Sequence, residues 1–149
     1  NLSDLCHKLI ENLNLSLLKN HHLNSQIAND IKVFGDPMAF TSIITNLLDN
    51  AAKYSPPKSK IEFILSKEKE SISIIIKDQG LGISPKDELA VFNKFYRVGN
   101  EETRNTKGTG LGLYIVKNLI KMHQGSVKIT ANQPKGTIFT IQLNSTNKA

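Results

Sequence analysis

Apolar residues recur at helical spacing along residues 37–54, and this segment is the most clearly patterned element of the chain. The repeat gives a helix one buried stripe. Its members are Ile44, Leu47, Leu48 and Ala51. Asp36 and Pro37 supply a capping residue and a proline at the first helical position, and prolines 56 and 57 end the element because proline cannot continue a helix. The sequence therefore predicts an amphipathic helix over residues 37–54.

The same spacing predicts a helix at each end of the chain. We expect an N-terminal helix over residues 3 to about 20, with Ser3 as its N-cap. Its apolar positions recur every four residues, at Leu5, Leu9, Leu13 and Leu17. The last helix follows a glycine-rich stretch, and its expected buried stripe is Gly112, Ile115, Val116, Leu119, Ile120 and His123. A short helix is expected around residues 87–92.

Strict alternation of apolar and polar residues predicts two hairpins. The first pairs residues 61–65 with 72–76 across a turn at 67–70, and the second pairs 127–131 with 138–143 across a turn near 134–136. A further strand pair is expected in residues 23–34. Residues 1–143 then form one α/β domain, and 144–149 form a polar tail.

The predicted helix over residues 37–54 also carries a polar face away from its leucines. Asn46, Asn50 and Lys53 lie at i, i+4 and i+7, which brings them to one side of the helix. An amide oxygen can ligate Mg²⁺, and an ammonium group can pair with phosphate. A solvated helix face, the commoner outcome for any single helix, explains the same three residues.

Composition narrows the classes of function. A chain of 149 residues suits one domain, and no apolar run reaches membrane-spanning length. The single cysteine, Cys6, excludes an internal disulfide and fits a reducing compartment. The net charge of +6 favours acidic or phosphorylated partners. The basic residues are dispersed and not interleaved with aromatics, so we expect neither nucleic-acid binding nor direct membrane contact.

Two glycine-rich stretches are candidates for a phosphate or nucleotide site. The strand over residues 72–76 leads into Asp78-Gln79-Gly80-Leu81-Gly82-Ile83, where a fixed carboxylate could accept a hydrogen bond from an exocyclic amine. Residues 108–113, Gly-Thr-Gly-Leu-Gly-Leu, open the last helix and present backbone N–H groups to an anion. Neither stretch is a Walker A or a Rossmann fingerprint. A plain turn explains the first stretch equally well.

The stretch between them, residues 98–107, is polar and has neither helical nor strand periodicity. It follows the aromatic run Phe92-Asn93-Lys94-Phe95-Tyr96-Arg97 and reads as a mobile loop. Its basic residues suit closure over phosphates. An ordinary solvated connection is the alternative.

Taken together, four ordered motifs resemble the N, G1, F and G2 boxes of the ATP-binding catalytic domain of bacterial sensor histidine kinases. They occupy residues 46–54, 78–82, 92–97 and 108–113. That family is related to DNA gyrase, the MutL mismatch-repair proteins and a major heat-shock chaperone. The resemblance implies a two-layer α/β sandwich of the Bergerat type, with a mixed sheet of about five strands, about three main helices on one face, and a lid over residues 93–107.

The resemblance also implies the roles of individual residues. Asn50 is the expected Mg²⁺ ligand, Asp78 reads the adenine amine, and Asn46, Asn50, Lys53 and Arg97 form the expected catalytic set. The implied ATP-binding residues are Asn50, Lys53, Tyr54, Asp78, Gly80, Gly82, Ile83, Phe92, Lys107, Gly108, Thr109, Gly110, Leu111, Gly112 and Leu113.

The amide at position 46 points to phosphoryl transfer. The resemblance implies that position 46 corresponds to a glutamate that activates water in the members of the superfamily that hydrolyse ATP. An amide cannot act as a general base in this way. The family's phosphoacceptor histidine is followed by an acidic residue, but His7 is followed by Lys8 and His21 by His22. We therefore expect this chain to be the catalytic part of a longer kinase, located on the cytoplasmic side. We expect it to bind ATP and Mg²⁺ but not to autophosphorylate alone.

The expected partners are the kinase's own phosphoacceptor and dimerisation domain and a response regulator receiver domain, with the fragment itself monomeric. The alternatives are a stand-alone ATPase, an anti-sigma-type serine kinase, and a non-catalytic nucleotide-sensing module.

Overall fold

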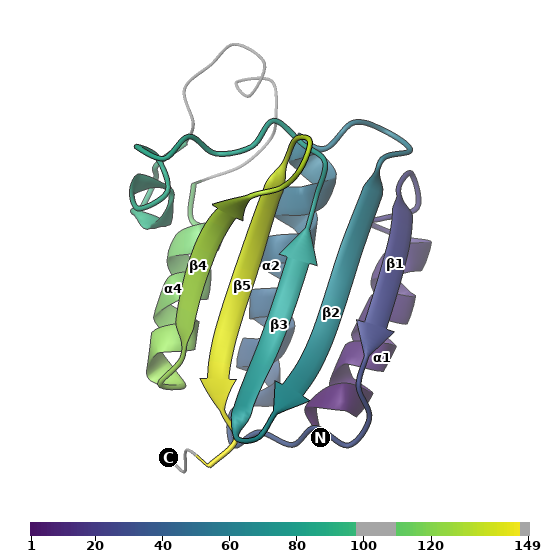
Figure 1. Cartoon of the computed structure of the whole chain (residues 1–149), viewed down its shortest axis with the longest axis vertical. Coiled ribbons are helices and arrows are strands. Elements are labelled where there is room, and N and C mark those ends of the chain that lie inside the picture. Colours follow the sequence, from purple (N-terminus) through teal and green to yellow (C-terminus); the bar gives the residue numbers. More distant parts are fainter. Residues whose placement is uncertain (98–109, 147–149) are drawn as a thin grey trace.

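The computed structural model describes residues 1–97 and 110–146, and in these ranges the chain forms two layers (Figure 1). Five strands make one sheet, and three helices cover one of its faces. The helices are α1 (Leu2–Leu15), α2 (Pro37–Tyr54) and α4 (Gly112–Met122), with a short 3-10 helix η1 (Ala90–Phe92). The predicted two-layer α/β sandwich is confirmed.

The sheet is mixed, in the order β1-β2-β3-β5-β4. Its strands are β1 (His22–Ile27), β2 (Lys60–Glu68), β3 (Ser71–Lys77), β4 (Ser126–Ala131) and β5 (Thr137–Asn144). β1 and β2 pair in parallel, whereas the other neighbours are antiparallel. The two predicted hairpins, β2–β3 and β4–β5, are confirmed. The antiparallel β3–β5 pairing joins them and brings the end of β3 next to the β4–β5 turn.

The core lies between the sheet and the helices. One side of the central hairpin is almost fully buried, at Ile61, Phe63, Leu65, Ile72, Ile74 and Ile76. The predicted stripe of α2, Ile44, Leu47, Leu48 and Ala51, is buried against it, as the helical spacing requires. Asp36 caps α2 by accepting the Met38 N–H at 2.9 Å, and Pro37 occupies the first turn, as predicted. α2 is therefore anchored at one end by local sequence and along its length by the core.

The predicted strand pair in residues 23–34 is wrong. Only β1 forms there, and it pairs with β2 instead of folding back into a hairpin. After Asp30, which has a left-handed backbone with φ 55°, the chain turns to the start of α1. The Ser3 hydroxyl accepts the Ile31 N–H at 2.9 Å and donates to Ala28 O at 2.6 Å. These contacts use the backbone groups that a second strand would need.

Ser3 is thus a buried residue of α1 and not its cap. The capping residue is Asn1, whose side chain accepts the Asp4 N–H at 3.1 Å. α1 ends at Leu15, short of the predicted residue 20. The predicted leucine repeat is only half-buried, and the deepest apolar positions of α1 are Leu2, Cys6 and Ile10.

Two smaller predictions also need correction. Around residues 87–92 the chain makes turns followed by η1 instead of a regular helix. On α4, Val116 and Ile120 are buried, but Ile115 is 38% exposed because it lies at the edge of the stripe. Within the described ranges, we find no helix with both the length and the apolar character needed to cross a membrane.

Candidate nucleotide-binding site

A cavity of about 680 Å³ opens between the C-terminal half of α2, the loop after β3, the start of α4 and the β4–β5 turn. Its size lies in the range of about 300–1,000 Å³ that small-molecule sites occupy. The cavity lining includes many of the residues predicted from the motifs: Asn46, Asn50, Lys53, Tyr54, Asp78, Gly82, Ile83, Arg97, Gly110, Gly112 and Leu113. Residues far apart in the sequence therefore meet around one space.

The α2 wall presents the predicted polar face. Asn46 donates from Nδ2 to Ser42 O at 2.8 Å and to Ser42 Oγ at 3.2 Å, which orients its amide. Lys53 forms an i,i+4 ion pair with Asp49, with Nζ 2.7 Å from Oδ2. Asp49 also lines the cavity, and the sequence analysis did not single it out. Its position four residues before a lysine on a helix was the available signal.

Asp78 lies at the end of β3 and is only 5% exposed. Its Oδ1 accepts the Gly80 N–H at 2.8 Å and the Thr137 N–H at 3.2 Å. Burial raises the pKa of this carboxyl group, and the two N–H donors partly offset the rise. Both hydrogen bonds from described residues go to Oδ1. Oδ2 is therefore the carboxylate oxygen that remains for a ligand.

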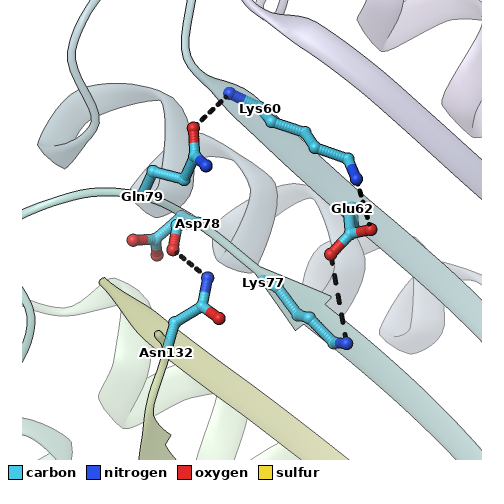
Figure 2. Close-up of polar contacts among 6 residues, drawn as sticks. All are labelled: Lys60, Glu62, Lys77, Asp78, Gln79 and Asn132. Atoms are coloured by element: carbon cyan, nitrogen blue, oxygen red, sulfur yellow. Dashed lines mark hydrogen bonds and ion pairs between the residues drawn. The ribbon is translucent and has the colours of Figure 1, made fainter. Parts of the chain in front are cut away.

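The strand end that carries Asp78 is tied to β2 on one side and to the β4–β5 turn on the other (Figure 2). On one side, Gln79 Oε1 accepts the Lys60 N–H of β2 at 2.9 Å. On the other, Asn132 donates from Nδ2 to the Asp78 main-chain oxygen at 2.7 Å. Glu62 lies between Lys60 and Lys77 and pairs with both, and the hydrogen bond from Lys60 lowers the pKa of Glu62. The position of Asp78 is thus set by the sheet.

The β4–β5 turn forms a wall of the cavity that the sequence analysis treated only as a turn. Its lining residues are Asn132, Gln133, Pro134, Lys135, Gly136 and Thr137. Gly136 has φ +116°, and a Cβ there would come within 1.9 Å of Asp78 O. Only glycine allows this approach. The contact joins segments almost sixty residues apart, so no local pattern announces it.

A third wall comes from the segment after the glycine loop. Asp87 accepts from the Ser84 hydroxyl and from the Tyr96 hydroxyl, each at 2.5 Å, and all three residues line the cavity. The Ser84 and Tyr96 hydrogen bonds lower the pKa of Asp87, and the Asp87 hydrogen bond raises the pKa of Tyr96. The sequence analysis gave Ser84 and Asp87 no role in the site, and it placed Tyr96 only within the F box and the lid over residues 93–107. Because Tyr96 belongs to the predicted lid, this cluster holds the first part of that segment at the cavity.

Some predicted residues lie elsewhere. Gly80 borders an adjacent cavity of about 230 Å³, and a Cβ there would come within 2.4 Å of Tyr54 O. Gly80 therefore lets the loop pack on the end of α2. Phe92 is buried, and Leu111 precedes α4 without lining the main cavity. Lys107, Gly108 and Thr109, and the predicted lid from residue 98 onward, lie outside the described residues.

The residues present fit ATP and Mg²⁺. Asp78 offers a buried acceptor, as an exocyclic amine requires. Asn50 offers an amide oxygen to the same cavity, and Mg²⁺ commonly takes one or two protein ligands together with substrate phosphates. Among residues 1–97 and 110–146, no group of three or more His, Cys, Asp or Glu side chains could hold a metal. A cation here would accordingly depend on Asn50 and the phosphates.

The fold and this cavity define a nucleotide-binding α/β sandwich, and comparison with known proteins gives its family. Residues 35–147 match the family model described as histidine kinase-, DNA gyrase B-, and HSP90-like ATPase. The chain belongs to this family of ATPases. The match confirms the resemblance drawn from the four motifs, and ATP is the nucleotide that the family uses.

Curated relatives include sensor kinases. The chain is 36% identical over 108 residues to the sensor protein CiaH of Streptococcus pneumoniae, and 32% identical over 144 residues to the sensor histidine kinase RppB of a Synechocystis species. These alignments cover 72% and 95% of the chain but only 24% and 32% of the relatives. The chain therefore spans about a quarter to a third of the relatives' length.

Solved structures agree with the fold. The mycobacterial sensor histidine kinase MprB superposes with a TM-score of 0.79 at 29% identity, covering 96% of this chain and 93% of that one. The catalytic domain of the histidine kinase ThkA gives a TM-score of 0.80 at 21% identity, covering 97% and 95%. The predicted Bergerat-type arrangement is confirmed.

Proposed function

We propose that this chain binds ATP together with Mg²⁺ and passes the γ-phosphoryl group to a histidine on a separate phosphoacceptor domain. The observation that carries the proposal is the buried Asp78 carboxylate at the end of β3, which lines the same cavity as the amides of α2. With Oδ1 held by Gly80 and Thr137, Oδ2 would accept a hydrogen bond from the adenine amine.

The amides of α2 support transfer in preference to hydrolysis. Asn46 lies where a water-activating acid would be needed, and its amide has no basic group. Among the described residues, two carboxylates besides Asp78 line the cavity, and each has a partner. Asp49 is paired with Lys53, and Asp87 accepts two hydroxyl hydrogen bonds that lower its pKa and weaken it as a base.

Phosphoryl transfer needs little covalent chemistry from the protein, since positioning and charge neutralisation supply most of the catalysis. Bound Mg²⁺ would neutralise phosphate charge, with Asn50 as its protein ligand. Lys53 and Arg97 bring positive charge to the cavity wall. The glycine-rich stretch at residues 108–112 would supply backbone N–H groups at the start of α4.

This activity places the chain in two-component signalling. The phosphoacceptor domain would be another part of the same kinase, and a response regulator would receive the phosphoryl group from it. The named sensor kinases among the relatives, which are three to four times longer than the matched region, support this assignment. The domain would act on the cytoplasmic side, without contacting nucleic acid or the membrane.

Nucleotide titration of three proteins tests the proposal. We expect the wild type to bind ATP more tightly with Mg²⁺ than with a chelator. Asp78→Asn should weaken ATP binding about tenfold or more, because the buried acceptor for the amine is altered. Asn50→Ala should keep the metal-free affinity and lose the gain from Mg²⁺.

Several results would contradict this. Wild-type protein that does not bind ATP refutes the site, and an Asp78→Asn variant with unchanged affinity refutes the role of Asp78. Rapid release of free phosphate that depends on Asn50 would indicate a stand-alone ATPase, and transfer to a partner's serine would indicate a serine kinase. Tight ATP binding without transfer to any histidine domain would indicate a sensing module.

A further inference from the structure

We propose that Asn132, in the β4–β5 turn, is a positioning residue for adenine recognition. It would act by holding the main chain of Asp78, and the inference rests on the proposed function of the site. Asn132 lines the cavity and donates from Nδ2 to Asp78 O at 2.7 Å across a sequence separation of 54 residues. Figure 2 shows the side chain of Asn132 reaching from the hairpin to the end of β3.

The side chain of Asn132 is oriented at both ends of its amide. While Nδ2 donates to Asp78 O, Oδ1 accepts the Gln133 N–H at 2.9 Å. The Asn132 backbone is held as well, because its N–H donates to Gly136 O at 3.0 Å. Residue 132 is therefore a fixed support and not a mobile surface amide.

The Asn132 side chain holds an atom of Asp78, the carbonyl oxygen, to which the other hydrogen bonds of this residue do not go. The Asp78 N–H donates to Thr137 O at 3.0 Å, and Oδ1 accepts from the backbone of Thr137 and Gly80. In the part of the chain that the structure describes, the Asp78 carbonyl accepts a hydrogen bond from Asn132, and Gly136 lies directly against that same oxygen. Without the Asn132 donor, the peptide after Asp78 loses the hydrogen bond to its carbonyl, so it can tilt slightly within its other contacts, and the carboxylate would shift with it.

A tilt of this kind matters because a hydrogen bond weakens steeply as its geometry departs from linear. The loss of affinity should appear only for a ligand that donates a hydrogen bond to the Asp78 carboxylate. Asn132 would thus influence how well the site distinguishes a purine with an exocyclic amine from one without it. A residue that merely stabilised the hairpin would weaken both ligands equally.

The test compares two triphosphates, ATP and purine riboside triphosphate, which lacks the amine. We expect Asn132→Ala to raise the Kd for ATP about tenfold and to change that for purine riboside triphosphate by less than about twofold. Asn132→Asp keeps an acceptor for the Gln133 N–H but removes the donor to Asp78. Its negative charge weakens both triphosphates alike, so the loss of affinity should still be larger for ATP than for purine riboside triphosphate. Asn144→Ala, at the opposite end of β5, is the matched control and should behave as wild type.

Equal loss for both ligands, or unchanged ATP affinity in both Asn132 variants, would overturn the inference. If thermal unfolding shows that Asn132→Ala is not folded, Asn132→Asp alone decides. These results are distinguishable from failure of the proposed function, in which the wild type itself would not prefer ATP to the ligand without the amine.

Discussion

Asp78 combines a proposed role in adenine recognition with a cost to the fold. A carboxylate that is 5% exposed has lost most of its hydration, and this is why its pKa is raised in the folded state. The backbone donors of Gly80 and Thr137 reduce that cost without removing it. A binding site that reads an amine through a buried acceptor must tolerate such a residue.

Asp78→Asn should therefore stabilise the nucleotide-free protein at pH 7 while weakening ATP binding. Since the pKa of Asp78 is raised on folding, the native state binds the proton more tightly than the unfolded state does. The stability of the wild type accordingly falls as the pH rises through the range above the ordinary carboxyl pKa of about 3.9. The amide variant does not titrate, so its advantage should shrink as the pH approaches 4.

Urea unfolding of both proteins at pH 7 and pH 4 measures this difference. A variant that is less stable than wild type at pH 7 would contradict the account, because it would mean that the N–H bonds to the charged carboxylate outweigh its desolvation. Nucleotide is left out of these measurements, so that binding does not enter the comparison.

At the residue scale, the sequence identified the side chains whose roles follow from local motifs. Asp78 and the amides at 46 and 50 were predicted, and the structure brings them to one cavity. Asn132 and Asp87 were not, because their contacts depend on how distant segments pack. A turn asparagine has many ordinary uses, and nothing in its neighbours indicates a partner 54 residues away.

Among the elements, α2 was predicted most completely because its signals are local. A capped start, a regular apolar stripe and a proline stop define its range without tertiary information. The segment after β1 was mispredicted for the opposite reason. Its backbone bonds to Ser3 of α1, and a strand pattern cannot reveal a competing partner elsewhere in the chain.

The far ends of α2 and α4 are joined by His123, which follows α4. Its Nδ1 donates to Leu119 O at 2.7 Å, its Nε2 accepts the Asp36 N–H at 3.2 Å, and its ring packs on Phe40 with centroids 4.8 Å apart. Both ring nitrogens are engaged. This gives His123 a structural role, as the link between the two helices that frame the site.

His123→Ala should lower the free energy of unfolding by about 1–3 kcal/mol, because a partly buried hydrogen bond and an aromatic contact are lost together. ATP affinity should stay within about twofold of wild type, since His123 does not line the cavity. His7→Ala, at an exposed position of α1, is the control and should change stability by less than about 0.5 kcal/mol. A loss of ATP affinity as large as that of Asp78→Asn would argue against a purely structural role.

At the scale of the whole molecule, the site exists because the sheet order brings two hairpins together. The antiparallel β3–β5 pairing sets the β4–β5 turn against the loop after β3, and α2 and α4 close the space from the helical layer (Figure 1). The two hairpins could be predicted from periodicity, whereas the fold class and the count of about five strands came from the family resemblance; the strand pair expected in residues 23–34 would have given a sixth strand. The strand order, and with it the wall that the β4–β5 turn contributes to the cavity, depended on pairing that no single segment encodes.

The same view explains why transfer should require a second domain. Among the described residues, His123 lies where α2 and α4 meet, away from the cavity, and both of its ring nitrogens are hydrogen-bonded. His21 lies near the end of α2, with Nε2 3.4 Å from Ser55 O, and does not line the cavity. An external imidazole would have to approach the phosphates.

The most direct test of the account incubates the chain with γ-labelled ATP and Mg²⁺, with and without the phosphoacceptor domain of a sensor histidine kinase. We predict stable label on a histidine of the added domain, no label on this chain when it is alone, and loss of transfer in Asn50→Ala. Label that accumulates on the chain alone, or ATP consumed chiefly to free phosphate while the acceptor stays unlabelled, would contradict the account.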